Sequence, residues 1–142
     1  MWADYDYSNF PNVLVKFNQN IEEEEQLNFF FQKWEELYKN GKEFNFIFDT
    51  SNLGYIKLSY IGKIRSFIKK MKSKPEQFLL KSLIIVSNKY IKYILNLIFK
   101  VQTPVSKLYI YNKKTKEETI EYTHLMNKIE TNQTADFTII NN

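Results

Sequence analysis

Short apolar runs alternate along the chain with longer segments of helical periodicity, and this alternation limits the possible folds more than any other feature. Runs rich in β-branched and aromatic residues predict strands at 13–17, 44–48, 83–86 and 107–111. Apolar residues spaced by three and four predict helices at about 21–39, from the 50s to 74, at 89–100 and at 115–129. We therefore expect an α/β fold with one mostly parallel sheet of about four to five strands and four helices.

The ends of several elements carry recognisable residues. Asn20, with Glu23 three residues later, has the form of a capping box and predicts the start of the first helix. Gly41 follows its end, where a left-handed residue is common. The second helix begins near Ser51 or near Ser59, because either hydroxyl is a suitable cap.

Other segments are less regular. Ser87-Asn88 is expected to cap the third helix, and the alternation of 107–111 is that of an edge strand. Residues 1–9 are expected to be a loosely held lead-in or a short edge strand. Residues 131–142 are expected to be a loose polar end with a weak apolar patch, Phe137 to Ile140.

Length and composition fit one globular domain, residues 1–142. The chain is 44% hydrophobic and 17% aromatic, with only three glycines and three prolines. It contains no cysteine, which excludes disulfides and thiolate metal sites. The sequence shows no signal peptide and no apolar run of about 20 residues, the length of a membrane span. We expect a cytoplasmic protein.

The groups needed for catalysis are largely missing. His124 is the only histidine, and on an amphipathic helix it is expected to lie at the surface. No glycine-rich phosphate loop occurs. The carboxylates Glu22 to Glu25 occupy adjacent positions at a helix start, so they point in different directions and complement the helix dipole rather than bind one metal ion. We therefore expect no enzyme activity, no catalytic residues, no cofactor and no metal.

Charge is divided unevenly along the chain. Residues 1–55 have a net charge of −6, residues 56–112 of +11, and residues 113–142 of −1. The basic section offers either a solvated surface, in a composition typical of an AT-rich genome, or a patch for an anionic partner. The predicted anion-binding patch consists of Lys63, Arg65, Lys69, Lys70, Lys72 and Lys74. One arginine among many lysines favours phosphate or membrane electrostatics over sequence-specific nucleic-acid recognition.

One segment of the chain resembles the STAS domain of anti-sigma-factor antagonists. It consists of an apolar strand, the residues Asp49-Thr50-Ser51-Asn52-Leu53-Gly54, and a helix. The family pattern is Asp-Ser-Ser-Gly-Leu-Gly, so Asp49, Leu53 and Gly54 match it and Asn52 departs from it. The resemblance implies a strand-to-helix turn whose Ser51 is the phosphorylated residue of regulatory members. From the residues alone, Ser51 is either such a switch or a helix cap, and Asp49 is a turn former.

A second, partial resemblance concerns the CRAL-TRIO lipid-binding domain. It is carried by Ser73-Lys74-Pro75-Glu76-Gln77-Phe78-Leu79, the strand Ile84-Ile85-Val86, the turn Ser87-Asn88 and the apolar helix after it. This resemblance implies a related topology and lipid binding. It transfers no lipid-contact residues, because the chain lacks the family's amino-terminal helical region.

Three functions are consistent with these observations. The first is a non-enzymatic regulatory module that binds a protein partner through Asp49, Thr50, Ser51, Asn52 and Gly54 and the basic second helix. The second is binding of lipid or an anionic membrane surface. The third is a structural protein that self-associates through opposite charges. Phe30, Phe31 and Trp34 have core spacing, so they are expected to pack inside rather than line a ligand site.

Overall fold

The computed structural model describes residues 1–142, whose six strands lie in the sheet in the order in which they occur in the chain. The strands are β1 (Ala3–Asp6), β2 (Asn12–Gln19), β3 (Phe44–Leu53), β4 (Leu79–Val86), β5 (Lys107–Asn112) and β6 (Phe137–Ile140). The helices are α1 (Glu24–Lys39), α2 (Leu58–Lys72), α3 (Lys89–Phe99) and α4 (Tyr122–Glu130). The predicted α/β class is confirmed, with six strands instead of four to five.

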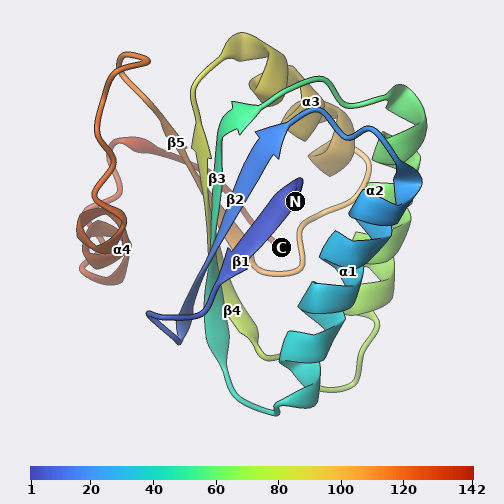
Figure 1. The fold of residues 1–142 in the computed structure, drawn as a ribbon. Helices are drawn as coiled ribbons and strands as arrows, with labels where there is room; N and C mark the ends of the chain where they lie inside the picture. Colours follow the sequence, from blue (N-terminus) through green and yellow to red (C-terminus); the bar gives the residue numbers. More distant parts are fainter.

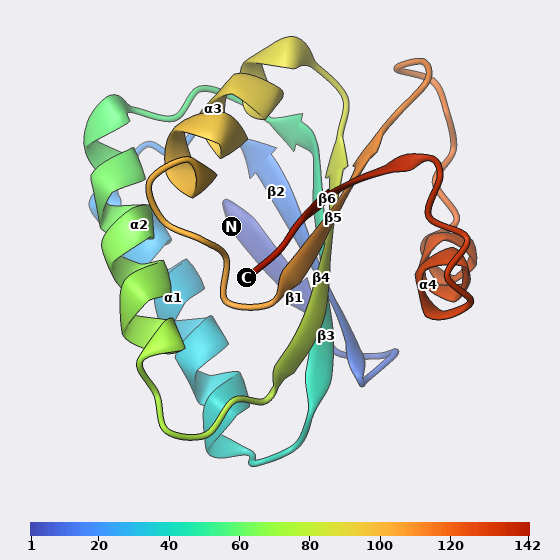
Figure 2. The same ribbon diagram turned by 180° about the vertical axis from the view of Figure 1, so that it is seen from behind.

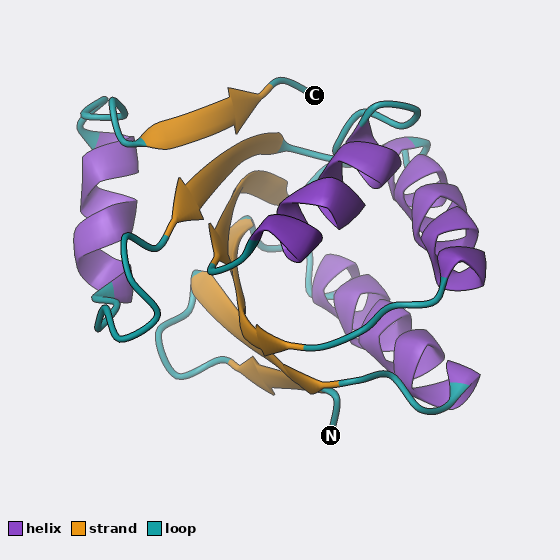
Figure 3. Cartoon of the chain, turned by 90° about the horizontal axis from the view of Figure 1, so that it is seen from above, coloured by secondary structure: helices purple, strands orange, loops and turns teal.

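Strands β2 to β5 are parallel, whereas β1 and β6 run antiparallel at the two edges. Each parallel strand is added on the same side of the previous one, so crossovers of one hand place all the connecting helices on one face. Figures 1 and 3 show α1, α2 and α3 together on that face and α4 alone on the other. The strand order never reverses, so this sheet has no topological switch point.

The sheet separates two apolar cores of unequal size. We call the side covered by α1–α3 the three-helix face, and its core contains 30 buried residues. The other side, the α4 face, has a core of seven buried residues. Figure 2 shows α4 on the opposite side of the sheet from α1–α3; in the chain it lies between β5 and β6, which pair at the sheet edge.

The prediction that β5 is an edge strand is wrong. Phe137–Ile140, expected to be part of a loose end, forms β6 and pairs with β5, with Tyr111 opposite Phe137. The other edge is β1, which pairs with β2 and confirms the edge-strand alternative for residues 1–9. Both edge strands have only four residues, a length that limits pairing with other chains.

The first helix begins later than its predicted cap. The cap residue is Glu23, whose backbone N–H donates to Oε1 of Gln26 at 3.2 Å, so the capping box lies three residues after the predicted pair. Asn20 instead accepts a hydrogen bond from the backbone N–H of Tyr55 at 2.7 Å. Gly41 has φ of +66°, which confirms the left-handed residue after the helix. Asn88 caps α3 by accepting from the N–H of Ile91 at 2.9 Å, as predicted.

The predicted turn after the second strand is wrong in its position. β3 continues through Asp49 to Leu53, and α2 begins at Leu58 with Lys57 as its cap residue, so neither Ser51 nor Ser59 caps it. The polar residues stay extended because β2 pairs with Asp49, Asn52 and Leu53. On the other side β4 pairs with Asp49, and the carbonyl oxygen of Ile85 accepts the Thr50 hydroxyl. The last helix, expected over 115–129, begins only at Tyr122.

Candidate functional site

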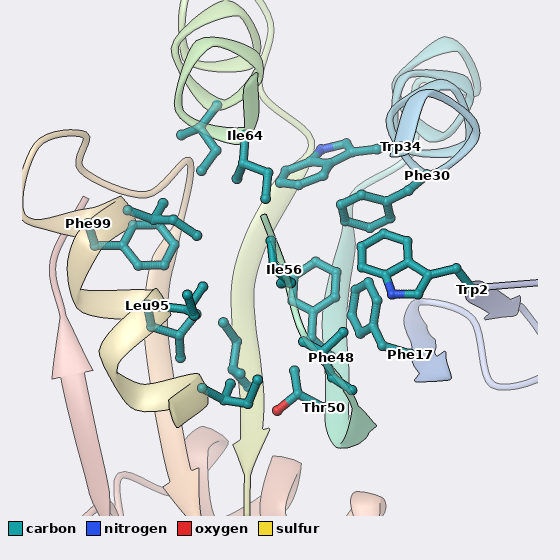
Figure 4. A pocket seen from close by; sticks show the side chains of 16 residues that line it. Trp2, Phe17, Phe30, Trp34, Phe48, Thr50, Ile56, Ile64, Leu95 and Phe99 are labelled. Carbon is teal, nitrogen blue, oxygen red and sulfur yellow. The ribbon is translucent and has the colours of Figure 1, made fainter. Parts of the chain in front are cut away.

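The most distinctive feature of the three-helix face is a cavity of about 120 Å³ between the helices and the sheet (Figure 4). Fifteen of its 16 lining residues are hydrophobic. They are Trp2, Phe17, Phe30, Trp34, Phe48, Thr50, Leu53, Ile56, Ile64, Ile68, Ile84, Ile91, Ile94, Leu95, Ile98 and Phe99. Natural cores contain few voids larger than a water molecule, so a void of this size is unusual.

The two sides of the cavity differ in chemistry. Aromatic rings from β2, α1 and β3, together with Trp2 just before β1, form one side. There Phe30 lies in edge contact with Trp2 and Phe17 at centroid distances of 5.9 and 5.3 Å. Branched aliphatic side chains from α2, α3 and β4 form most of the opposite side, as Figure 4 shows for Ile64 and Leu95. A flat apolar molecule is therefore offered rings on one side and methyl groups on the other.

Thr50 contributes the only hydroxyl to the wall. Its Oγ1 donates to the carbonyl oxygen of Ile85 at 2.6 Å, and the residue is 5% exposed. Its hydroxyl proton is therefore already used inside the protein. The unpaired donors among the lining residues are the indole N–H groups of Trp2 and Trp34, which are buried and have no hydrogen-bond partner. The rest of the wall is hydrocarbon, whereas a buried water needs two to four polar partners.

A smaller void of about 30 Å³ adjoins the cavity towards the opposite end of the sheet. The two voids share five lining residues: Trp34, Phe48, Ile68, Ile84 and Phe99. The wall of the smaller void includes Ser82 and Ser106, whose hydroxyls bond to each other at 2.9 Å. Rotation of these shared side chains would join the two voids.

The predicted site at Asp49–Gly54 occupies the bulged end of β3. Lys16 lies opposite Asp49 but Asn18 lies opposite Asn52, so β3 has one extra residue here. Asp49 Oδ1 accepts from the Ser51 N–H at 2.9 Å, which supports the bulge. The bulge also shifts the alternation of β3, so Thr50 and Leu53 both line the cavity.

The other side of Asp49 contacts the last helix. Its Oδ2 accepts a hydrogen bond from the hydroxyl of Tyr122 at 2.5 Å. Burial, together with this hydrogen bond and the nearby carboxylate charge, raises the pKa of Tyr122 well above its usual value. Asp49 therefore joins β3 to α4, a structural contact that the sequence did not predict.

The remaining residues of the predicted site differ in exposure. The Ser51 hydroxyl is buried and has no hydrogen-bond partner, whereas Asn52 is exposed. A side chain at Gly54 would meet Asn20 Oδ1 at 2.1 Å, so it would displace the amide that accepts from the Tyr55 N–H. Phosphorylation of Ser51 stays a prediction, and it requires this strand end to open.

The predicted basic patch lies on α2, except Lys74, which follows it, and three of its six residues contact neighbouring helices. Two lysines seven residues apart face α1: Lys63 pairs with Glu24, and Lys70 pairs with Glu35 at 2.9 Å.

The other side of α2 faces α3 and the loop after it. Arg65 Nε donates to the carbonyl oxygen of Leu97 at 3.0 Å, and Lys72 donates to the Thr103 hydroxyl. Lys69 and Lys74 form no ion pair. The charge difference between the first and middle sections is thus partly satisfied within one chain, between adjacent helices.

No group of three or more histidine, aspartate or glutamate side chains lies close enough together to hold a metal ion. His124 is exposed on α4, as expected. Phe30 and Trp34 are buried in the core as predicted, yet they also line the cavity. None of the helices has the length and apolar character required to cross a membrane.

Comparison with protein-family models, curated proteins and solved structures found no match for the chain. The likeness to STAS and CRAL-TRIO domains therefore rests on the sequence motifs alone.

Proposed function

We propose that this chain is a non-enzymatic binding module whose cavity takes a small, neutral, apolar molecule. The observation that carries the proposal is the apolar cavity of about 120 Å³ on the three-helix face. An engineered apolar cavity of roughly 150 Å³ in another protein stays dry and binds benzene or xenon, so this volume corresponds to a ligand about the size of one aromatic ring.

The cavity leaves apolar wall atoms without packing neighbours on one side. In closed engineered cavities each Å³ of residual space costs about 24 cal/mol, and this cavity is only partly enclosed. A ligand that fills the space recovers dispersion contacts, because the wall atoms then have neighbours on both sides.

The proposal follows the lipid-binding alternative, with a narrower ligand class. The cavity is too small to enclose a whole diacyl lipid, so the ligand is a small ring compound or a short apolar fragment. The regulatory interaction through Ser51 receives less support, because that hydroxyl is buried and most of the basic residues of α2 contact other helices.

The distribution of isoleucines provides the test. The cavity wall contains Ile56, Ile64, Ile68, Ile84, Ile91, Ile94 and Ile98, whereas Ile47, Ile85 and Ile129 belong to the α4 face. Titration of the protein with xenon or benzene, followed by isoleucine δ1-methyl NMR, is expected to shift the first group and leave the second unchanged. Shifts spread equally over both groups, or none, would overturn the proposal.

Two variants sharpen the test. Ile94→Phe places a ring in the cavity and is expected to abolish the methyl shifts, whereas the matched change Ile129→Phe on α4 leaves them intact. Leu95→Ala enlarges the cavity and is expected to favour larger rings over benzene. Thermal unfolding with and without benzene provides a second readout, because ligand at 100 times its Kd stabilises a fold by about 2.7 kcal/mol.

A further inference from the structure

The end of the molecule where α2 and α3 begin has an unusual number of exposed apolar and aromatic side chains. Leu58 is 69% exposed, Tyr55 59% and Tyr93 56%. The rings of Tyr55 and Tyr90 stack at a centroid distance of 6.2 Å, and Tyr93 lies one helical turn after Tyr90. Nothing in the fold covers these side chains. Single exposed apolar residues are normal on a protein surface, but a cluster of them indicates a contact site.

Lysines lie around this cluster on the side of α2 and α3. The exposed carboxylates Glu22 to Glu25 border it on the side of α1, after Asn20, which contacts Tyr55. Lys57, Lys89 and Lys92 are exposed, and none of them forms an ion pair. No aspartate or glutamate occurs between Glu76 and Glu117. The first turns of α2 and α3 also lack acidic residues, unlike that of α1. These three lysines thus lack an ion-pair partner, unlike Lys63 and Lys70, and Lys57 Nζ lies 5.9 Å from the centroid of the Tyr60 ring.

This combination fits a lipid surface better than a nucleic acid or an acidic protein. Tyrosine rings are favourable at the boundary between headgroups and acyl chains, and lysines are attracted to anionic headgroups. Protein surfaces that bind nucleic acid generally use arginine for bidentate hydrogen bonds to bases and phosphates, and this surface contains no arginine. The exposed leucine and tyrosines gain nothing from a phosphate backbone, but they gain from burial in a bilayer boundary.

We propose that this end of the molecule docks on an anionic lipid bilayer. We call it the Tyr–Lys surface, made of Tyr55, Lys57, Leu58, Lys89, Tyr90, Lys92 and Tyr93. The opposite side of α3 lines the cavity through Ile91, Ile94, Leu95 and Ile98. One helix thus separates the bilayer from the cavity. The docking goes beyond the proposed ligand binding and does not require the cavity to be filled.

The test is sedimentation of the full chain with phosphatidylcholine vesicles that contain or lack phosphatidylserine, at low and at physiological salt. Binding is expected only with phosphatidylserine and is expected to weaken as salt rises. Each lysine near an anionic surface contributes about fivefold to binding, so Lys89→Gln with Lys92→Gln lowers the partition coefficient by about 25-fold. The matched control Lys114→Gln with Lys116→Gln, in the exposed loop before α4, changes it less than twofold.

A second measurement separates insertion from simple charge attraction. Tyr93→Trp is expected to show a blue shift of tryptophan emission on anionic vesicles, because Trp2 and Trp34 are buried and give a constant background. Leu58→Ser is expected to weaken vesicle binding without changing its salt dependence.

Several outcomes would overturn the docking proposal. These are equal binding to neutral vesicles, an equal loss in the Lys114 and Lys116 control, or binding to a single-stranded RNA homopolymer but not to vesicles. The variant Ile94→Phe is expected to lose xenon binding and keep vesicle binding. The failure of one proposal is therefore distinguishable from the failure of the other.

Discussion

The two faces of the sheet are built by different means. The three-helix face has 30 buried residues and an apolar cavity, and α1, α2 and α3 must pack on the sheet and against one another. The α4 face has seven buried residues under a single helix, and its margin is held by hydrogen bonds to carboxylates, from Tyr122 to Asp49 and from Tyr111 to Glu118. Three helices on a twisted sheet leave space between them, whereas one helix settles without a void.

The largest difference between the faces is expected in stability. Phe46 is 0% exposed and lies within a network of rings, with centroids 5.0 Å from Trp34 and 4.5 Å from Phe48. Phe46→Ala is expected to lower the free energy of unfolding by about 3–5 kcal/mol. Leu125→Ala on the α4 face is expected to cost about 2–3 kcal/mol and to leave xenon binding intact. Urea unfolding measures both, and a larger loss for Leu125→Ala would contradict the comparison.

A smaller effect is expected at the hydrogen bond between α4 and β3. Tyr122→Phe removes the hydroxyl that donates to Asp49, at an expected cost of about 1–2 kcal/mol. The pKa of Tyr122 is raised in the fold, so its contribution is complete below pH 10 and is lost as pH rises further. Unfolding free energies measured between pH 8 and 11 are expected to fall less steeply for Tyr122→Phe than for the parent. Parallel profiles would show that this bond does not stabilise the fold.

The smallest effect is expected at the margin of the same face. Hydrogen bonds from the Tyr111 hydroxyl and from the Lys114 N–H lower the pKa of Glu118. Its contribution is present above the ordinary pKa of 4.5 and is lost as pH falls through the lowered value. Because the group is largely exposed, Glu118→Gln is expected to cost well under 1 kcal/mol. Acid unfolding monitored by circular dichroism should show a slightly flatter acid limb, and an unchanged limb would count against the contact.

Much of the fold could be predicted from local pattern. The four parallel strands and α1 to α3 were predicted because each carries a strong apolar period or a cap, such as Asn88. The edge strands β1 and β6 have only four residues each, and their extension depends on partners distant in the chain. Residues 49–53 have turn-like composition, but pairing with β2 along this stretch, and with β4 at Asp49, overrides that preference.

The candidate site was harder to predict than the fold. Phe30 and Trp34 have the same spacing whether they fill a core or surround a void, so no sequence pattern distinguishes the two. The ion-pair partners of the α2 lysines could not be predicted either, because Lys63 and Lys70 meet glutamates of α1 only in the folded structure, where the two helices lie side by side. The Tyr–Lys surface did leave a signal, namely tyrosines and lysines together on the outer side of the predicted third helix.

The sequential strand order also bears on how the chain folds. Every strand pairs only with its immediate predecessor and successor in the chain, so no pairing has to wait for a distant segment. Such a sheet can assemble by accretion, one strand–helix unit at a time, as in repeat proteins where each unit contacts only its neighbours. The low sequence separation of these pairings favours rapid folding for a parallel sheet. The same order implies that α4 and β6 are added last, onto the edge formed by β5.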